Sequence, residues 1–381
     1  MPRWLVAVIT AVLTMALTLG VLGLLMGRDG LAVMQGWMLA RWAFVEEDVD
    51  LQAVSDGALD GMVEALGDRW SYYVDEESYV ALMEHRSNQY VGIGVIVDYT
   101  NEDGIYIRSV TKNSPAEKAG LLAGELIIAV QGESAAGDAR YEVVDLIGGQ
   151  PGDERVLKIR SAAGEEREVT ITLAPIAVEI ATGYLTEEGV GVVTLANFNS
   201  NSAAMFREVT DDLVEQGAHA LIFDVRGNGG GYVDELNDIL DYLLPEGIVF
   251  RSEPRWGKEY ERESDAECID LPFVVLVDQN SYSAAELFAA ELRETAGAYI
   301  VGEVTSGKGY SQRTFALLNG GAAGISTACY YTGSGISLIG TGITPDVLLS
   351  LSEDAEIMRS AGVLEVENDL QLQAALKLLL E

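Results

Sequence analysis

The spacing of apolar and polar residues changes character along the chain and predicts several regions. Residues 4–26 form an uncharged apolar run, and residues 31–87 carry apolar positions at three- and four-residue intervals, which is typical of helices. Short β-branched runs punctuated by glycine then extend to about Pro175, and a different rhythm begins at Gly189. We therefore predict a membrane anchor (1–30), a helical segment (31–87), a β-rich domain (88–175), an α/β core (176–350) and a helical tail (351–381).

The region after Gly189 repeats β-α units. Predicted strands cover 190–195, 220–225 and 273–278, and predicted helices cover 202–216, 233–244 and 284–295. Such repetition predicts a layered α/β core with mainly parallel strands. Asn319-Gly320-Gly321 is a hairpin signal that joins two further strands, 314–318 and 324–331. Residues 364–381 have the pattern of an amphipathic helix.

The N-terminal apolar run is long enough to cross a membrane, since about 20 apolar residues span a bilayer as one helix. No small-residue cleavage site of the A-x-A kind precedes Met26, which favours an uncleaved anchor over a removed signal peptide. Arg3 predicts a cytoplasmic N-terminus, although Arg28 on the other flank weakens that bias. We predict a single-pass protein of the cell membrane with its bulk on the extracytoplasmic side, or a secreted protein if the segment is cleaved.

Composition fits a folded multidomain protein. Apolar residues make up 49% and charged residues 22% of the chain, which is an ordinary composition for a globular protein. Its 381 residues are long enough for two or three domains. The 60 acidic against 24 basic residues give a net charge of -36, which serves solubility and would repel a phosphate backbone. The charge therefore argues against nucleic acid as a partner.

The cysteines and histidines exclude several kinds of chemistry. Cys268 and Cys329 lie far apart and in no metal-like spacing, so a zinc site has no support, whereas one disulfide is left open. The histidines are His85, in the helical segment, and His219, at the start of a predicted strand. About 6 residues at ~3.3 Å each put His219 roughly 20 Å from the glycine-rich turn at the strand's other end. A Ser-His-Asp triad is therefore not expected.

A serine at the start of a predicted helix is the candidate nucleophile. Ser283 follows a buried strand and opens the helix 284–295, where the positive end of the helix dipole favours developing negative charge. Serine is also a common helix N-cap, and taken alone a serine at such a position is more often a cap than a nucleophile.

A lysine between two glycines after the next strand is the candidate base. Lys308 could act as a general base only when neutral, and moving its pKa from ~10.4 to ~7 costs about 4.6 kcal/mol, so its site must be dry and rigid. A surface lysine in a flexible turn is the simpler alternative. Gly302, Gly307 and Lys308 also match most of a phosphate loop, but Gly309 stands where a hydroxyl would bind magnesium, so nucleotide binding is a weak alternative.

A glycine-rich turn, residues 224–231, follows the strand 220–225. Tight glycine turns leave backbone N–H groups that can face an oxyanion, and Ala284 beside the candidate nucleophile could supply another donor. A strand-to-helix turn that merely needs positive φ would have the same sequence.

Together these motifs resemble the carboxyl-terminal processing peptidases, S41-type serine peptidases with a PDZ domain and a Ser-Lys pair. The matching segments are D-G-M (60–62) and G-D-R-W-S-Y-Y (67–73) for the helical prelude, Y-V-G-I-G (90–94), S-P-A-E-K-A-G-L (114–121) and G-E-L-I (124–127) for the PDZ domain, D-V-R-G-N-G-G-G (224–231), S-Y-S-A-A-E (281–286) and T-G-I-T-P-D-V (341–347) for the core. In that family the lysine follows the nucleophile by 25 positions and a glutamine follows the lysine by four, as 308 − 283 and 312 − 308 do here. This register selects Ser283 over Ser281.

The resemblance implies an α/β peptidase core of the ClpP/crotonase-like kind with an inserted PDZ domain. It also implies that Ser283 attacks a peptide carbonyl, Lys308 takes the proton and Gln312 orients the lysine. Backbone N–H groups of Gly230 and Ala284 would form the oxyanion hole. Protein substrates with apolar C-termini would be recruited through a terminal carboxylate at the loop Gly92-Ile93-Gly94-Val95, without any metal or cofactor. Homodimerisation is left open.

Two departures from the family pattern affect regulation and binding. Gly148 replaces a basic residue that many members carry, and the turn 332–335 lacks the usual proline, with Ile336 in place of a basic residue. The main rival hypothesis is a membrane-bound PDZ adaptor whose core binds without cutting. Loss of Ser283, Lys308 or Gln312 would favour that rival, and all three are present.

Overall fold

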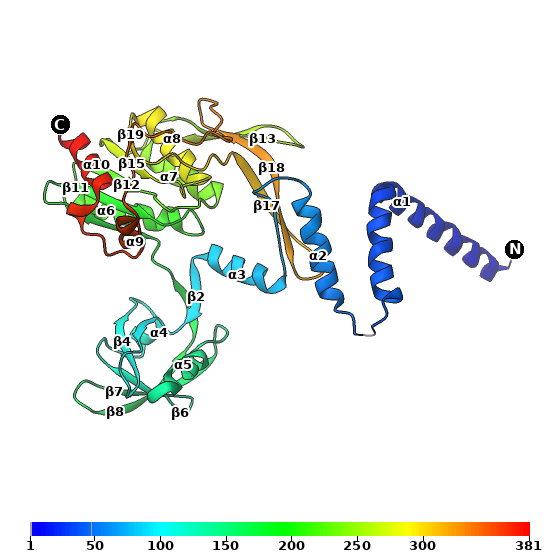
Figure 1. Cartoon of the computed structure of the whole chain (residues 1–381), viewed down its shortest axis with the longest axis horizontal. Helices are drawn as coiled ribbons and strands as arrows, with labels where there is room; N and C mark the ends of the chain where they lie inside the picture. The colour runs from blue at the N-terminus through cyan, green and yellow to red at the C-terminus, as the bar shows by residue number, and fades with distance from the viewer. Residues whose placement is uncertain (1, 47) are drawn as a thin grey trace. The chain divides into compact units, whose positions relative to one another are not determined.

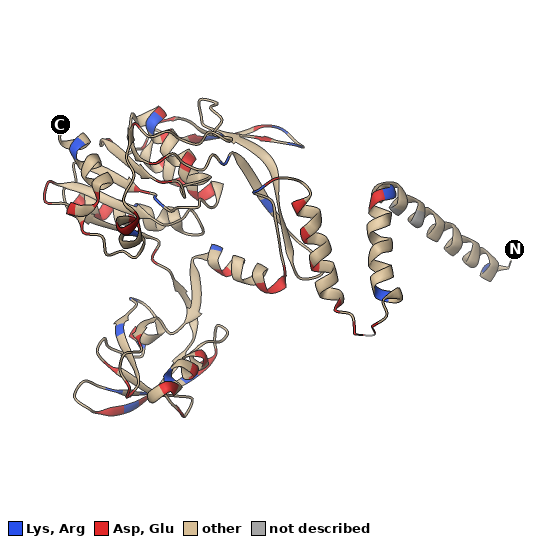
Figure 2. Cartoon of the chain, viewed as in Figure 1, with Lys and Arg blue, Asp and Glu red and all other residues tan. Residues whose placement is uncertain are grey.

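The structure is a computed structural model that describes residues 2–46 and 48–381. Its contacts divide the chain into two compact units: the first holds Met1–Val80 with Gln312–Ser326, and the second holds Ala81–Ser311 with Thr327–Glu381 (Figure 1). Acidic residues occur on helices, strands and loops from Asp29 onward, whereas residues 3–28 of the N-terminal helix contain none (Figure 2).

The first unit begins with a long apolar helix, α1 (Arg3–Ala43), which is interrupted at Gly27, where φ is 62°. Within the described ranges, no single helix is both long and apolar enough to cross a bilayer. The helix pair Arg3–Thr18 and Gly23–Ala43, bent by 67°, meets that test of length and composition only when both parts are taken together.

The remainder of the first unit combines a helix with three strand segments. The elements are α2 (Leu51–Glu64), β1 (Tyr72–Val74), β17 (Tyr310–Ala316) and the beginning of β18 (Ala322–Tyr331). β17 and β18 form the predicted hairpin, with Gly320 at φ 91° in its turn. β1 pairs antiparallel with β18, Tyr72 lying opposite Gly324. The prediction that residues 31–87 are helical is therefore wrong at residues 72–74. The strand is only three residues long, and its partner lies about 250 positions away in the sequence.

The β-rich region of the second unit is an antiparallel sheet, ordered β3-β4-β5-β7-β8, with β6 paired to β5. Its elements are α3 (Glu76–Ser87), which leads into the region, and β2 (Gln89–Gly92), β3 (Val95–Asp98), β4 (Ile105–Val110), α4 (Pro115–Lys118), β5 (Leu126–Val130), β6 (Glu133–Ser134), α5 (Arg140–Val143), β7 (Glu154–Arg160), β8 (Glu166–Thr172) and β9 (Ala174–Ala177). β2 and β9 pair with each other, so the chain enters and leaves this region through one two-stranded ribbon. Its core is built from fully buried side chains such as Ile105, Ile127 and Leu157.

The α/β core has a six-stranded sheet in the order β10-β11-β12-β15-β16-β19. Its elements are β10 (Ala181–Leu185), β11 (Val190–Leu195), α6 (Ser202–Glu215), β12 (Ala220–Asp224), α7 (Val233–Leu243), β15 (Phe273–Val277), α8 (Ala284–Ala296), β16 (Tyr299–Gly302) and β19 (Val347–Leu348). The strands β11, β12, β15, β16 and β19 pair in parallel, and β10 is antiparallel at one edge. The predicted layered core with mainly parallel strands is confirmed.

The sheet is covered on both faces, because alternate residues of its strands pack against different helices. Phe223 and Val275 belong to a cluster with side chains of α6, α7 and α8, whereas Ile222 and Val274 pack with α10 (Leu370–Leu380). Every residue of β12 and β15 is buried, as expected for central parallel strands. The carboxyl ends of these strands carry the candidate catalytic segments.

Two further features complete the second unit. β13 (Gly247–Pro254) and β14 (Tyr260–Ser264) form an antiparallel hairpin that the apolar pattern did not reveal, and β13 also pairs with the end of β18. The tail contains α9 (Glu353–Ser360) as well as α10. The predicted tail helix starts later than expected, because a 3-10 turn, Val366–Asn368, precedes it.

Candidate active site

Ser283 stands at the sharp turn between β15 and α8, as the N-cap of that helix. Its backbone has φ 62° and ψ -122°, a conformation that costs on the order of 1–3 kcal/mol for a residue with a side chain. Its backbone N–H donates to the carboxylate of Glu286 at 3.0 Å, which is one of the two hydrogen bonds that define a capping box. The turn is therefore strained and held by a specific bond, as expected for a serine presented for reaction.

The two serines of this turn have different roles. Ser281 is fully buried, and its hydroxyl donates to the Val225 carbonyl at 2.8 Å and accepts from the Asp278 N–H at 3.0 Å. Ser283 is partly exposed at the helix N-terminus. The structure thus uses Ser281 to fix the loop and leaves Ser283 as the serine that can meet a substrate, in agreement with the spacing argument.

Glu286 connects the candidate nucleophile to the candidate base. One of its oxygens, Oε2, accepts from the backbone N–H of Ser283 at 3.0 Å and from that of Lys308 at 2.9 Å. The other, Oε1, accepts from the N–H of Gly307 at 2.8 Å and from the Thr305 hydroxyl at 2.5 Å. The side chain is fully buried, and hydrogen bonds to a charged group contribute about 1.5–3 kcal/mol each. This carboxylate fixes the backbones of residues 283 and 308 relative to each other.

Lys308 lies in the loop after β16, beside the residue that precedes the nucleophile. Its Nζ is 5.5 Å from the centroid of the Tyr282 ring, within the range of a cation–π contact. The loop is closely packed, because a Cβ on Gly307 would lie 2.9 Å from the backbone nitrogen of Gly342. The structure therefore places Lys308 in a tightly held loop and contradicts the alternative of a lysine in a loose surface turn.

Tyr330 supports the same region from β18. Its hydroxyl donates to the carbonyl of Lys308 at 2.5 Å. Burial, and then the charge of Glu286, raise the pKa of this hydroxyl, whereas a hydrogen bond with Ser283 lowers it. The phenol therefore remains protonated and can donate to the carbonyl of Lys308, which fixes the loop of the candidate base.

The glycine-rich turn after β12 lies directly against the nucleophile. A Cβ on Gly230, where φ is 83°, would come within 2.8 Å of the Ser283 Cβ and 2.9 Å of the Ala284 nitrogen. The two predicted oxyanion donors are thus brought together. However, the N–H of Gly230 donates to the Asn228 side chain at 2.8 Å, so it would have to exchange that partner to meet an oxyanion. The prediction from the family did not include this bond.

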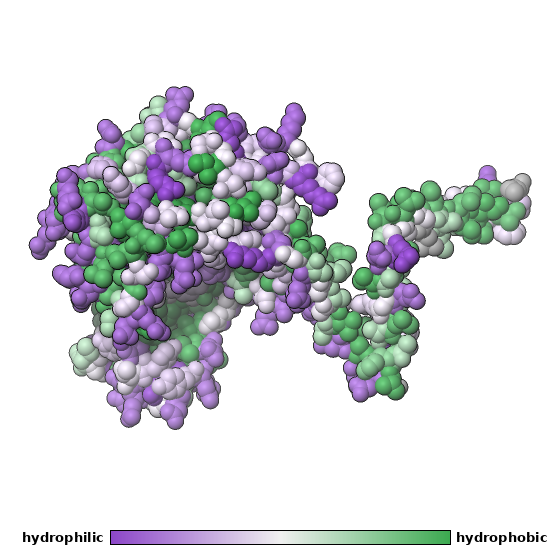
Figure 3. Space-filling view, turned by 45° about the horizontal axis from the view of Figure 1, so that its top comes forward, coloured by the Kyte–Doolittle hydropathy of each residue, from purple (hydrophilic) through white to green (hydrophobic). Residues whose placement is uncertain are grey.

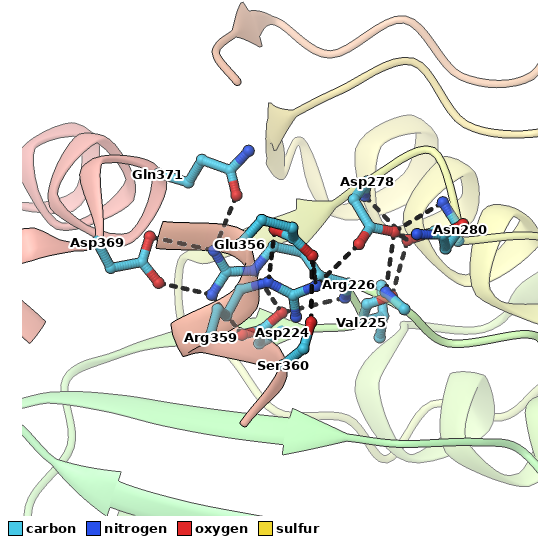
Figure 4. Close-up of polar contacts among 12 residues, drawn as sticks. Asp224, Val225, Arg226, Asp278, Asn280, Glu356, Arg359, Ser360, Asp369 and Gln371 are labelled. Carbon is cyan, nitrogen blue, oxygen red and sulfur yellow. Dashed lines mark hydrogen bonds and ion pairs between the residues drawn. The ribbon is translucent and has the colours of Figure 1, made fainter. Parts of the chain in front are cut away.

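A buried ion-pair network holds the start of this turn to the tail of the chain. The Arg226 guanidinium is 3% exposed and pairs with Asp224 at 2.6 Å and with Asp369 at 2.8 Å, and Nη1 also donates to Gln371 (Figure 4). Removing one partner of such a pair typically costs about 3–5 kcal/mol, because a buried charge is left uncompensated. The tail is therefore an integral part of the core.

Asp278 connects this network to the nucleophile turn. Its Oδ1 accepts from the N–H groups of Gly227 and Asn280, each at 2.9 Å, and its Oδ2 pairs with Arg359 of α9 at 3.1 Å (Figure 4). In addition, the Tyr282 N–H donates to the Asn228 carbonyl. The oxyanion turn and the nucleophile turn are fixed to each other through these bonds.

Gln312 belongs to the first unit, where it lies on β17. Its Nε2 donates to the Ser326 hydroxyl on β18 at 2.9 Å. The assignment of Gln312 as orienter of Lys308 comes from the resemblance to the family, in which a glutamine follows the lysine by four positions.

The predicted peptide-binding loop connects β2 to β3. The Ile93 side chain is buried, and its carbonyl accepts from the Ala116 N–H, while the Gly94 carbonyl accepts from the Thr111 N–H. Gly94 has φ 83°, and a Cβ there would lie 2.3 Å from the Ser114 Cβ.

The segment around Gly148 lacks the family's basic residue. The guanidinium of Arg155 donates hydrogen bonds to the Leu146 and Gly148 carbonyls of this segment.

Several of these supporting residues were absent from the sequence-based prediction. Glu286 is part of the S-Y-S-A-A-E motif, which by itself assigns it no role, and Tyr330, Asp278 and Asp369 have no distinguishing pattern. The spacing of Glu286 from Ser283 matches a capping box, which could have indicated one of its bonds.

His219 immediately precedes β12, whereas the glycine-rich turn 224–231 follows that strand. The expected separation of the histidine from this turn therefore fits the structure.

Comparison with known proteins gives consistent matches. Residues 189–349 match the model of peptidase family S41, and residues 106–161 match a PDZ domain model. The chain is 31% identical over 314 residues to the carboxy-terminal processing protease CtpA of Bacillus subtilis (strain 168), covering 82% of this chain and 67% of that protein. It is 28% identical over 335 residues to the chloroplastic C-terminal processing peptidase of Tetradesmus obliquus, covering 83% and 72%.

A solved structure agrees with these matches. The photosystem II D1 C-terminal processing protease aligns with a TM-score of 0.50 and 26% identity, over 91% of this chain and 93% of that one. The fold and the sequence matches thus define a serine peptidase with a PDZ domain. The chain belongs to the carboxyl-terminal processing peptidases of family S41.

Proposed function

We propose that this peptidase cleaves proteins near their C-termini with Ser283 as nucleophile, Lys308 as base and Gln312 as the group that orients the lysine. The observation that carries the proposal is the sharing of one Glu286 oxygen between the backbone N–H groups of Ser283 and Lys308. This arrangement supports a nucleophile and a base held in fixed register. A non-cleaving adaptor would have no need of it.

The chemical steps follow from these groups. Ser283 Oγ attacks the peptide carbonyl carbon while its proton passes to Lys308 Nζ, and the Ala284 N–H receives the developing oxyanion. Gly230 supplies a second N–H once its bond to Asn228 is exchanged. The C–N bond then breaks, and Lys308 returns the proton to the leaving amine. Water, deprotonated by Lys308, hydrolyses the resulting ester and regenerates Ser283.

We propose that substrates are protein chains with apolar C-termini. The loop Gly92-Ile93-Gly94-Val95 would receive the terminal carboxylate through backbone N–H groups, and the substrate would lie as an added strand. Homodimerisation stays a prediction that light scattering can check.

We further propose that α1 anchors the protein in the cell membrane, with the peptidase on the extracytoplasmic side. Support comes from the unusual exposure of its apolar side chains, including Leu13 at 64%, Leu17 at 69% and Leu24 at 87% (Figure 3). Surface of this kind is stable in lipid and unfavourable in water. Protease protection in sealed vesicles tests the orientation.

The test of the activity uses the full chain in detergent micelles and an unfolded protein with an apolar C-terminus. The native protein is expected to release peptides that mass spectrometry detects, and Ser283→Ala is expected to release none. Equal cleavage by both would contradict the assignment of Ser283, and no cleavage of several such substrates by the native protein would contradict the proposed activity.

A further inference from the structure

The short helix α9 sends one side chain to the buried carboxylate that lies between the two turns of the candidate active site. Arg359 Nη2 lies 3.1 Å from Asp278 Oδ2, and the pair is largely enclosed, since the Asp278 side chain is 4% exposed and that of Arg359 is 15% exposed (Figure 4). Glu356, three residues earlier on α9, accepts from Arg359 Nε at 3.1 Å and also from Nη2. The guanidinium is therefore held on its own helix in the orientation that meets Asp278.

Helix α9 itself contributes little to the apolar core. Each of its residues is at least partly exposed, and the apolar side chains of Ile357 and Met358 are 62% and 49% exposed. This distinguishes α9 from α10, whose apolar side chains pack on the central sheet. A change at Arg359 is therefore expected to remove an ion pair and to leave the packing of the core in place.

The two oxygens of Asp278 have different partners. Oδ2 meets Arg359, whereas Oδ1 accepts from the N–H of Gly227 and from that of Asn280, each at 2.9 Å. Gly227 belongs to the glycine-rich turn that carries a proposed oxyanion donor, and Asn280 belongs to the turn that carries the proposed nucleophile. A single carboxylate oxygen thus joins the two turns.

The ion pair with Arg359 determines where that oxygen lies. A buried carboxylate that loses its charged partner admits water or turns toward another donor, because an isolated charge is unfavourable in a site closed to solvent. Either change moves Oδ1 of Asp278 away from its two N–H donors, so the two turns shift relative to each other. An oxyanion is stabilised by donors about 2.7–3.1 Å from the developing charge, so a small shift is enough to weaken that stabilisation.

We propose that Arg359 is a positioning residue, which fixes through Asp278 the distance between the proposed oxyanion donor of the glycine-rich turn and the proposed nucleophile. This role rests on the proposed function and deepens it, because it gives the C-terminal tail a part in holding the reacting groups. A second contact of the tail acts at the same place. Asp369 pairs at 2.8 Å with Arg226, the neighbour of Gly227, so the tail holds two adjacent residues of the glycine-rich turn.

The test measures kcat and KM of the full chain in detergent micelles, on an unfolded protein with an apolar C-terminus. Arg359→Gln removes the charge and is expected to lower kcat about 10-fold and to leave KM within about twofold, because the ion pair holds the reacting groups and not the substrate. Arg359→Lys keeps a charged donor for the single bond to Asp278, and its kcat is expected to stay within about threefold of native. A native kcat in Arg359→Gln, or an equal loss in Arg359→Lys, would overturn the proposal.

A double-mutant cycle with Asp278→Asn tests the route through this carboxylate. Arg359→Gln is expected to cause no further loss of kcat in the Asp278→Asn background, and losses that multiply would contradict the route. Arg293→Gln is the matched control, because this arginine of α8 donates to the carbonyl of Thr344, a residue of neither turn, at 3.0 Å. Its kcat is expected to stay native, and a loss equal to that of Arg359→Gln would show that the effect is not specific to Asp278.

Two further measurements separate this proposal from other causes. All rates are compared at least about 15 °C below the melting temperature of each variant, so that the molecules are folded whatever their stability. The rate at which a fluorophosphonate labels Ser283 requires no protein substrate, and Arg359→Gln is expected to lower it by the same factor as kcat. An unchanged labelling rate would contradict the proposal.

Failure of the proposed function would be recognised by a different result. If Ser283→Ala keeps native activity, the proposed mechanism fails together with the role of Arg359. If Ser283→Ala is inactive while Arg359→Gln keeps a native kcat, the mechanism stands and only the positioning role is wrong.

Discussion

The turn at Ser283, proposed as catalytic, and the PDZ loop 92–95, proposed to bind peptide, both follow a strand, but the structure holds them in different ways. In the core, a fully buried carboxylate, Glu286, receives four hydrogen bonds from groups spread over residues 283–308. In the PDZ loop, the backbone carbonyl of Ile93 accepts one bond, from Ala116 of α4, and that of Gly94 accepts from the Thr111 N–H and, at 3.4 Å, from the Ser114 hydroxyl. Covalent chemistry needs reacting groups in fixed register, whereas capture of a peptide as an added strand tolerates adjustment.

The largest effect is expected from weakening the support of the catalytic turn. Glu286→Gln keeps the shape, but it places an NH₂ group against N–H donors and so separates the backbones of Ser283 and Lys308. Because misplacement by about 1 Å can cost roughly 100-fold, we expect kcat/KM to fall by about that factor. Glu294→Gln, at an exposed position of the same helix, is the control and should stay within about twofold of native. Near-native activity of Glu286→Gln would mean that this carboxylate does not set the geometry.

A second buried carboxylate on α8 should make the core's stability depend on pH. Burial raises the pKa of Glu291 from 4.5 to about 7, and the carboxyl accepts from the N–H of Gly333. The folded state then binds the proton more tightly than the unfolded state, so stability is full below pH 4.5 and falls as pH rises toward 7. The penalty above pH 7 is on the order of 3 kcal/mol.

Glu291→Gln keeps the acceptor for Gly333 and removes the charge. We expect its melting temperature to exceed the native value by about 5 °C at pH 8 and to differ little at pH 5, as measured by calorimetry. An equal shift at both pH values would show that the charge is not the cause. The N–H of Gly333 donates to Glu291, and a Cβ at this position would lie 1.7 Å from the Ile248 carbonyl oxygen, so a proline at position 333 would not fit the turn as it stands in this protein.

The smallest effect is expected in the PDZ loop. Gly94→Ala brings a Cβ within 2.3 Å of the Ser114 Cβ, so the loop must shift, and we expect KM to rise several-fold with kcat within about twofold. Gly164→Ala is the matched control, because its φ of 86° carries the same backbone strain with no atom within 4 Å of the new Cβ. Equal KM values for the two variants would argue against a role of the Gly94 loop in substrate capture.

The sequence predicted best those parts of the molecule in which local pattern and tertiary structure agree. The boundaries of β11, α6, β12, α7, β15 and α8 agree with the predicted ranges to within one residue, because long apolar runs alternate with amphipathic helices there. β1 was missed because a three-residue strand owes its existence to β18. The assignment of Ser283 and Lys308 comes from the family resemblance and its spacing, whereas the bonds of Glu286 to residues 307 and 308 and of Asp278 to Gly227 join segments that are distant in the sequence, so no local pattern contains them.

Covalent labelling of the full chain by a fluorophosphonate tests the central claim most directly, because the reagent reports on an activated serine without any substrate. We expect mass spectrometry to find the label on Ser283 in the native protein, and Lys308→Ala to react at least about 100-fold more slowly, since a general base contributes about 10²–10⁴-fold. Labelling of another residue, or an unchanged rate without Lys308, would contradict the account.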